Sequence, residues 1–497
     1  MSSKHKSSSK KNKRSSSKEP SRELSRDPTE NTDNVNSKSK YYPIIIKLSP
    51  PKDSILDHDS DIVFSSNIDY PRSDYGFHHF IHANKNKTET LKQFEGRKKV
   101  YLVFNRFERY VDNYEESIGT TSKNYFSLGG DKPDILSRGF YKLWEILLMF
   151  DLIDVSKEKF VSAHLAEGPG SFIQATMFYR DTFCKKGLSK NDKFYAVTLH
   201  PEDVGGKEHV PELEKKFVEY YKTEKPQRFI LHQTYTKQVA GGSKDKDNGD
   251  ITDPKTIKLF GGQMDEKADL ITGDGGFDWI NENVQEQEAF KLIIAQIVAA
   301  FKLQKKGGSF VCKFFETFTK VSVKLVSILT QLYDSVHLVK PLMSRQSNSE
   351  KYAVCMGFKY SDKDKEHKTI SKKLDTILEE SHKNKQNISD LFTSYSVPRP
   401  FINEMVEINR LISNEQLKSI NEIIAFVKKE IHAGDEYHDR REQQIEGSRY
   451  WIDLFLPKSE EVDKKKKIYS DMIKTVCDNS QKGATNLDKS LVYVNNQ

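Results

Sequence analysis

The stretch from about residue 137 to residue 359 alternates short apolar runs with amphipathic segments of helix length. Runs rich in β-branched and aromatic residues are typical of strands, and apolar side chains that repeat every three or four positions are typical of helices. A chain that alternates in this way forms a sheet covered by helices. The sequence therefore predicts an α/β fold for this stretch.

The predicted elements can be placed by residue number. Strands are expected at residues 159–166, 193–199, 228–232, 268–272, 309–315, 335–339 and 352–358. Helices are expected at residues 139–151, 171–180, 211–222, 283–304 and 319–333. The fourth helix carries Phe290, Ile293, Ile297 and Phe301 along one broad apolar stripe, so it should pack on the sheet.

Regions of different composition flank this core. Residues 1–40 are Ser- and Lys-rich and hold 11 basic against 5 acidic side chains, a local charge of +6 out of +7 for the whole chain. Such a segment buries too little apolar surface to fold, so we expect a disordered tail. It is either a polybasic arm that attracts a phosphate backbone at low salt or a solubilising or targeting tail. We further predict a flanking region at 41–124, a core domain at 125–360, a charged linker with one helix at 361–387, and a mostly helical region at 388–497.

The composition also excludes several classes of protein. No stretch reaches the ~18 consecutive apolar residues of a membrane span, and the chain begins without the apolar core of a secretory signal. The four cysteines, Cys184, Cys312, Cys355 and Cys477, form no CxxC pair. We therefore expect reduced thiols, no metal site, no membrane association and an intracellular protein, cytoplasmic or nuclear.

A glycine-containing turn follows the first predicted strand of the core. The turn consists of Glu167, Gly168, Pro169 and Gly170, and a helix is expected from Ser171. A strand, a glycine turn and a helix can form a nucleotide pocket, because glycine allows close approach and the helix presents free N–H groups. The third glycine of a dinucleotide fingerprint would fall at Ile173, so a pyrophosphate is not the expected ligand. A tight structural turn explains the same residues.

Four charged residues lie in apolar contexts elsewhere in the core. They are Lys142 in a helix, Asp274 at the end of a strand, Lys313 within a strand, and Glu350 before a strand. Each alone has an ordinary explanation, as a lysine that extends to the surface or as a cap. Ligands of open α/β sheets bind at the carboxyl ends of the strands, so together the four residues indicate a site at that rim.

Six sequence motifs together resemble one enzyme family. They are RGFYKLWEI (138–146), LAEGPGSFIQA (165–175), LITGDGGFDW (270–279), QEQE (285–288), GGSFVCKFFETF (307–318) and SNSEKYAVC (347–355). In this order they resemble the FtsJ-type RNA 2′-O-methyltransferases, and most closely the Adrift-type, cap-specific mRNA enzymes. The resemblance covers about residues 125–358. The Lys- and Asn-rich flanks look similar to members encoded by large DNA viruses.

The resemblance implies a fold, a cofactor and a substrate. The fold would be a Rossmann-like S-adenosylmethionine-dependent methyltransferase core with a mostly parallel seven-stranded sheet and helices on both faces. The catalytic tetrad would be Lys142, Asp274, Lys313 and Glu350. S-adenosyl-L-methionine would bind at Glu167, Gly168, Pro169, Gly170, Asp250 and Asp274. The partner would be RNA, at the capped 5′ end of mRNA, and Lys313 would accept or steer the proton of a ribose 2′-hydroxyl.

Other functions remain open from the sequence. The same chemistry could act on ribosomal or transfer RNA, and a catalytically silent RNA-binding or scaffold subunit could keep the same fold. Ile173 makes a dehydrogenase the least favoured reading, because such enzymes need the third glycine.

Overall fold

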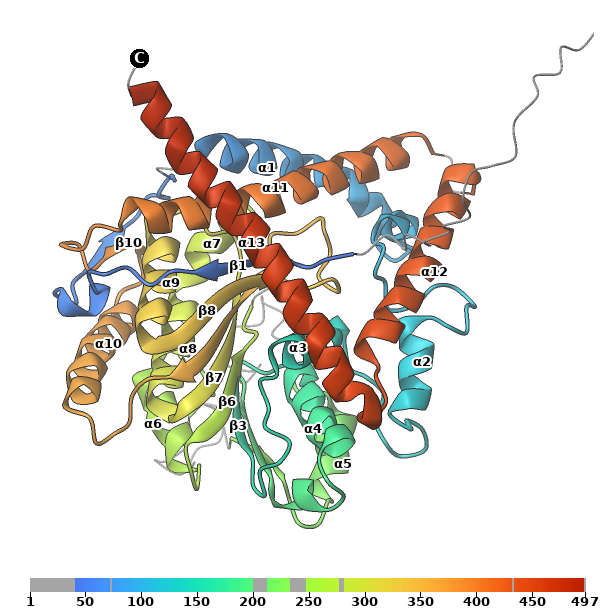
Figure 1. Ribbon diagram of the computed structural model, residues 1–497, viewed down its shortest axis with the longest axis horizontal. Coiled ribbons are helices and arrows are strands. Elements are labelled where there is room, and N and C mark those ends of the chain that lie inside the picture. The colour runs from blue at the N-terminus through green and yellow to red at the C-terminus, as the bar shows by residue number, and fades with distance from the viewer. Residues whose placement is uncertain are drawn as a thin grey trace, which may run out of the picture. The chain divides into compact units, whose positions relative to one another are not determined.

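One eight-stranded sheet organises the computed structural model, which describes residues 41–71, 74–199, 212–232, 247–276, 281–430 and 433–495 (Figure 1). The strand order is β1-β8-β9-β7-β6-β3-β4-β5. The seven predicted strands are all present, as β3 Val161–Leu165, β4 Lys193–Val197, β5 Phe229–Leu231, β6 Ala268–Gly273, β7 Gln304–Phe314, β8 Tyr333–Lys340 and β9 Lys351–Phe358. The predicted tail, residues 1–40, lies outside the described residues.

Most neighbouring strands of the sheet are parallel. β5, β4, β3, β6 and β7 pair in parallel, whereas β9 lies antiparallel between β7 and β8. This mostly parallel sheet, in which β9 and the edge strand β1 (Ile44–Leu48) run in the reverse direction, together with helices on both faces, confirms the predicted fold class.

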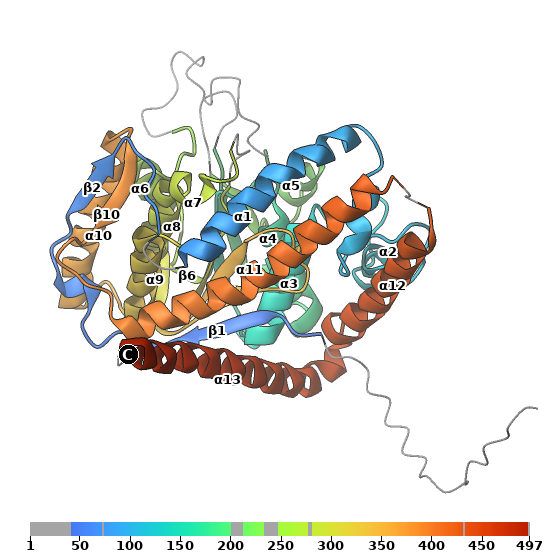
Figure 2. The same ribbon diagram turned by 90° about the horizontal axis from the view of Figure 1, so that it is seen from above.

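Helices cover both faces of the sheet (Figure 2). On one face lie α6 Pro254–Gly262, α8 Phe290–Leu303, α9 Lys320–Leu332 and α10 Lys365–Lys383. On the other face lie α3 Arg138–Phe150, α4 Ser171–Phe183 and α5 Lys215–Lys222. In β7, Phe310 and Cys312 belong to one apolar cluster and Val311 to the other, as expected for a strand buried on both sides.

The eighth strand comes from the predicted flanking region. β1 (Ile44–Leu48) pairs antiparallel with β8, with Ile44 opposite Lys340 and Leu48 opposite Val336. Ile45 and Ile46 are fully buried and belong to the two opposite apolar clusters. Part of residues 41–124 therefore completes the core sheet.

The predicted linker also folds against the core. Its helix α10 packs on α8 through buried Ile370, Leu374, Ile377 and Leu378. After it, β10 (Asn387–Leu391) pairs with β2 (Ile62–Ser65) in a separate two-stranded sheet. Tyr42–Gln497 forms one compact unit, so the boundaries at 124/125 and 360/361 stay a prediction about sequence segments.

Three long helices make up most of the C-terminal part. They are α11 Arg399–Lys428, α12 Asp435–Phe455 and α13 Val462–Asn495. The other helices are α1 Tyr75–Lys87, α2 Ile118–Tyr125 and α7 Gln285–Glu288, with 3-10 turns at Ile55–Asp57, Thr88–Phe94, Val100–Phe104, Leu188–Asn191 and Ser459–Glu461. In Figure 2, α1 runs beside α11, and α13 passes along β1, where Ser480 Oγ donates a hydrogen bond to the Ile45 carbonyl. Among the described helices, none has both the length and the apolar character to span a bilayer.

Two tryptophans join α12 to α3. Trp144 Nε1 donates to the Phe455 carbonyl over 2.6 Å, and Trp451 Nε1 donates to Glu145 Oε1 over 2.6 Å. Both tryptophans and Glu145 are fully buried. Because a buried polar group without a partner is costly, these bonds should fix the C-terminal helices on the core.

Replacement of Trp451 tests this attachment. Trp451→Phe removes the indole N–H that Glu145 accepts, so the free energy of unfolding should fall by at least about 1 kcal/mol. Arg449→Ala on the same helix is the matched control. It breaks an ion pair with Glu116 in which both side chains are 59% exposed, and it should change stability by less than about 0.5 kcal/mol. Denaturant-induced unfolding measures both, and equal effects would contradict the inferred role of Trp451.

Candidate active site

The strand order brings three of the predicted residues to one edge of the sheet. Asp274 directly follows β6, and Lys313 is the last residue but one of β7. These strands are parallel neighbours, so their carboxyl ends meet at the same edge. β9 runs antiparallel to β7, with Tyr352 opposite Lys313, so Glu350 at its start lies at that edge too.

Helix α3 supplies the fourth residue, Lys142. The helix begins after Ser137, whose side chain accepts a hydrogen bond from the Gly139 N–H over 3.0 Å. Lys142 lies among buried apolar residues, and its Nζ is 2.6 Å from Glu350 Oε1. The packing of α3 on the sheet therefore directs this amine toward the rim.

Two ion pairs connect the four side chains. Lys142 pairs with Glu350 as above, and Lys313 Nζ lies 3.1 Å from Asp274 Oδ1. Lys313 also donates a hydrogen bond to the Asp274 carbonyl oxygen over 2.7 Å. Asp274 thus holds the Lys313 amine from two directions.

Tyr352 links the two ion pairs and was not predicted from the sequence. Its hydroxyl donates to Glu350 Oε1 over 2.8 Å and lies 3.3 Å from Asp274 Oδ1. A signal for it exists, since residues two apart in an extended chain point to the same face, and Glu350 directly precedes β9. Its pairing with Lys313 depends on the β7–β9 register, which the sequence does not reveal.

The site is shielded from solvent but remains accessible. The exposed fractions of the side chains are 12% for Lys313, 14% for Lys142, 15% for Glu350 and 26% for Asp274. Burial raises the pKa of Glu350, but the charges of Lys142 and Lys313 outweigh it and lower that pKa to about 2. Glu350 is therefore ionised at neutral pH, and the two lysines and two carboxylates compensate one another.

A third lysine, Lys340, is buried and holds the turn before Glu350. Lys340 Nζ donates to the carbonyl and the side-chain oxygen of Asn348, both over 2.8 Å, and to the Glu350 carbonyl over 3.2 Å. Burial lowers the pKa of Lys340 to about 7. Lys340 therefore fixes the main chain at Glu350, a role that was not predicted from the sequence.

Glu167 in the glycine turn caps helix α4. Its Oε1 accepts hydrogen bonds from the Phe172 and Ile173 N–H groups, both over 2.8 Å. These N–H groups are therefore not free for a phosphate, in line with the expectation that the turn holds no pyrophosphate. The other oxygen, Oε2, is buried and accepts no hydrogen bond from the described residues. Burial raises the pKa of Glu167 to about 8, and the charge of Asp274 adds to this effect.

Two glycines after Asp274 bring the tetrad next to the turn. A Cβ added to Gly275 would lie 3.2 Å from Ala166 Cβ and 2.7 Å from Leu292 Cδ2. A Cβ on Gly276 would lie 3.1 Å from Lys313 Nζ. A side chain at either position would have to displace Leu292 or the Lys313 amine, so the packing favours glycine where the chain passes between the turn and Lys313. Residues 277–279 of the same motif lie outside the described residues.

The structure does not link Asp250 to the other predicted cofactor residues. Its Oδ1 accepts hydrogen bonds from the N–H and Oγ1 of Thr252, over 2.9 and 2.7 Å. These bonds close a turn ahead of α6, and none of the described hydrogen bonds of Asp250 reaches the turn at 167–170. The assignment of Asp250 to the adenosine stays a prediction.

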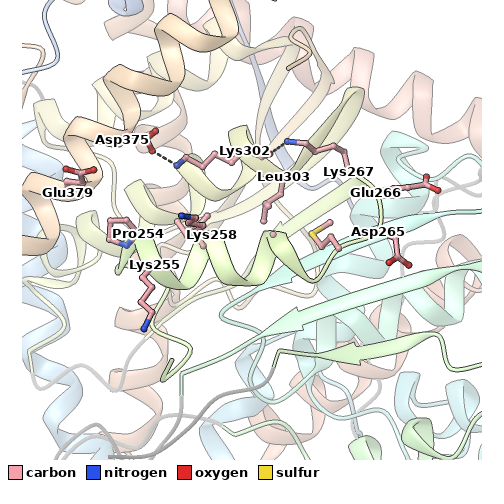
Figure 3. A pocket seen from close by; sticks show the side chains of 13 residues that line it. Pro254, Lys255, Lys258, Asp265, Glu266, Lys267, Lys302, Leu303, Asp375 and Glu379 are labelled. Carbon is pink, nitrogen blue, oxygen red and sulfur yellow. Dashed lines mark hydrogen bonds and ion pairs between the residues drawn. The ribbon is translucent and has the colours of Figure 1, made fainter. Parts of the chain in front are cut away.

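A cavity lies at the edge of the sheet opposite the tetrad. Figure 3 shows it beside α6, the end of α8 and α10. Its volume is about 830 Å³. Its lining includes Glu266 and Lys267, just before β6, and Lys302, which pairs with Asp375 over 2.5 Å. These residues precede the strands whose far ends carry Asp274 and Lys313, so the cavity is separate from the tetrad.

Comparison with known proteins identifies a family for the central part of the chain. Residues 135–358 match the model of the FtsJ-like methyltransferase family. This part of the chain belongs to that family. The family implies S-adenosylmethionine as methyl donor.

The relatives of this FtsJ-like chain include active and inactive proteins. The chain is 28% identical over 313 residues to cap-specific mRNA (nucleoside-2′-O-)-methyltransferase 1A of Caenorhabditis briggsae. The aligned residues cover 60% of this chain and 32% of that protein. Over the same length it is 28% identical to the inactive 1B protein of that organism, covering 60% and 33%. It is also 28% identical over 263 residues to an uncharacterized protein of Acanthamoeba polyphaga mimivirus, covering 52% and 30%. The chain thus spans about a third of the length of these relatives.

The shifted pKa of Glu167 gives a pH-dependent prediction. The folded-state pKa is raised, so between the ordinary value near 4.5 and about 8 the folded chain binds more protons than the unfolded chain. The contribution of Glu167 to stability should therefore fall as the pH rises from about 5 to 8. Glu167→Gln keeps an oxygen acceptor for α4 but cannot ionise. Its stability relative to the unaltered chain should rise across this pH range in denaturant unfolding, and a constant difference would contradict the raised pKa.

Proposed function

We propose that this chain is an S-adenosylmethionine-dependent RNA 2′-O-ribose methyltransferase that acts on the 5′ cap region of mRNA. The observation that supports it most is the convergence of Lys142, Asp274, Lys313 and Glu350 beside the glycine turn. The similarity to cap-specific mRNA methyltransferases suggests the substrate class.

The residues around the turn fit the methyl donor. We assign its pocket to Glu167, Gly168, Pro169, Gly170, Asp250 and Asp274. The partly exposed carboxylate of Asp274 is an acceptor that can receive hydrogen bonds from an ammonium or hydroxyl group, and the buried Oε2 of Glu167 is a polar atom without a hydrogen-bond partner among the described residues. Gly170 has a φ of 108°, and a Cβ there would lie 3.1 Å from Leu213 Cδ2, so the conformation and the packing of the turn both favour glycine. When bound, S-adenosylmethionine supplies a methyl group on a positively charged sulfur.

The tetrad would then position the ribose. Lys313, oriented by the carboxylate and the carbonyl of Asp274, would contact the 2′-hydroxyl and accept or steer its proton. Lys142 and Glu350 would hold the hydroxyl from the side of α3, with Tyr352 as a positioning residue between the carboxylates. Because the four charges compensate one another, the geometry forms before RNA binds, and orientation would provide much of the rate.

An alternative is a catalytically silent subunit with the same fold. The inactive relative in Caenorhabditis briggsae shows that similarity alone does not establish activity. The complete set of paired lysines and carboxylates favours the active enzyme, because a binding surface has no need for two partly buried ion pairs.

Lys313→Ala tests the catalytic role. Loss of the amine should lower methyl transfer by at least about 10²-fold, since a positioned proton-transfer group contributes about 10²–10⁴-fold. S-adenosylmethionine affinity, measured by calorimetry, should change little. Lys306→Ala is the matched control, because Lys306 lies on the same strand with its side chain 62% exposed, and it should leave turnover unchanged. Near-normal turnover of Lys313→Ala would refute the assigned role.

A substrate comparison tests the specificity. Labelled methyl transfer from S-adenosylmethionine should occur to the ribose of a short capped RNA and be much weaker to the same RNA without a cap. The modified nucleotide is then located by nuclease mapping. Equal transfer to both RNAs would favour the ribosomal or transfer RNA alternative, and transfer to neither would favour the silent subunit.

A further inference from the structure

Two histidines of α1 face a buried glutamate that follows β7. His78 and His82 lie one helical turn apart, so they share a face of the helix. His82 Nε2 is 2.7 Å from Glu316 Oε2, although the two residues are 234 positions apart. One ring nitrogen of each histidine and one oxygen of Glu316 all lie within 4.8 Å of one another. The cluster contains no cysteine, so the absence of a CxxC pair in the sequence did not bear on it.

We propose that His78, His82 and Glu316 form a binding site for a divalent transition-metal ion of the zinc type. Two histidines four positions apart on a helix, completed by a carboxylate from another element, are a donor set that suits zinc. Bonds of about 2.0–2.2 Å in a tetrahedral site place ligand atoms about 3.3 Å apart. The distance between His82 Nε2 and Glu316 Oε2, now 2.7 Å, would have to increase, and the longest distance among the three ligand atoms would have to decrease. Rotation of the side chains can make both changes.

Lys85 limits the affinity and orders the glutamate. Its Nζ pairs with the other oxygen, Glu316 Oε1, over 2.6 Å and donates to the Glu282 carbonyl over 3.1 Å. A ligating carboxylate commonly has its second oxygen hydrogen-bonded in this way. The positive charge of Lys85 opposes a cation, so Lys85→Gln should bind metal more tightly than the unaltered chain.

The surroundings allow an ion to enter and give it a structural role. The His82 side chain is 16% exposed, whereas the His78 ring packs edge-on to Phe318 with centroids 5.5 Å apart. Three protein ligands leave one position of a tetrahedral ion open. The ion would join α1, which lies outside the FtsJ-like match, to the chain three residues beyond Lys313.

Cobalt(II) binding to the full chain tests the proposal. The unaltered chain should bind one equivalent with the visible absorption of a tetrahedral or five-coordinate ion, and zinc should displace it. His78→Ala and His82→Ala should weaken calorimetric zinc affinity at least 10-fold. His79→Ala is the control, because this exposed neighbour stacks on Tyr75 and not on the cluster.

Circular dichroism establishes that each variant is folded, and His78→Ala serves as the mildest change, since it leaves the His82–Glu316 bond in place. The proposal is overturned if the unaltered chain and His78→Ala bind cobalt equally, or if neither binds one equivalent. In either case the cluster is a metal-free hydrogen-bond network. The measurement needs neither RNA nor S-adenosylmethionine, so it stands apart from a failure of the proposed function.

Discussion

The antiparallel insertion of β9 between β7 and β8 is the constraint on which the site depends. It places the start of β9 beside the end of β7, so Glu350 meets Lys142 and approaches Lys313 and Asp274. Were β9 parallel to its neighbours, Glu350 would lie at the opposite edge of the sheet, about 25 Å away for a strand of this length at about 3.3 Å per residue. Lys142 would then be a partly buried cation without its carboxylate.

Charge compensation explains how so many ionised groups are tolerated at the rim. A buried charge is costly unless it is paired, and a network of this kind is stable only when its members are satisfied. Lys142 with Glu350, Lys313 with Asp274, and the Tyr352 hydroxyl between the carboxylates meet that requirement. Two further residues support this network from outside it. Lys340 fixes the main chain at Glu350, and Glu167 fixes the start of α4.

The segments outside the family match are part of the same structure. β1 extends the sheet, α10 covers one face, and α12 is fastened to α3 through Trp451. The strands of the core were predictable because their apolar runs are long and bounded by turn residues. β1 was not, because a five-residue apolar run in a mixed context does not indicate which strand it pairs with. α10 was predicted as part of a charged linker because of its many charged residues, although it carries four apolar residues at helical spacing that are buried in the structure.

The sequence by itself determined the α/β class, the seven core strands and the identity of the four charged residues, because periodicity and local motifs are properties of neighbouring positions. Tertiary structure decided which strand ends meet, that Tyr352 lies between the ion pairs, and that Glu167 uses one oxygen to cap α4. It also brought His78 and His82 to Glu316. These contacts join residues up to 234 positions apart, and their distances depend on strand register and helix packing, which no local pattern encodes.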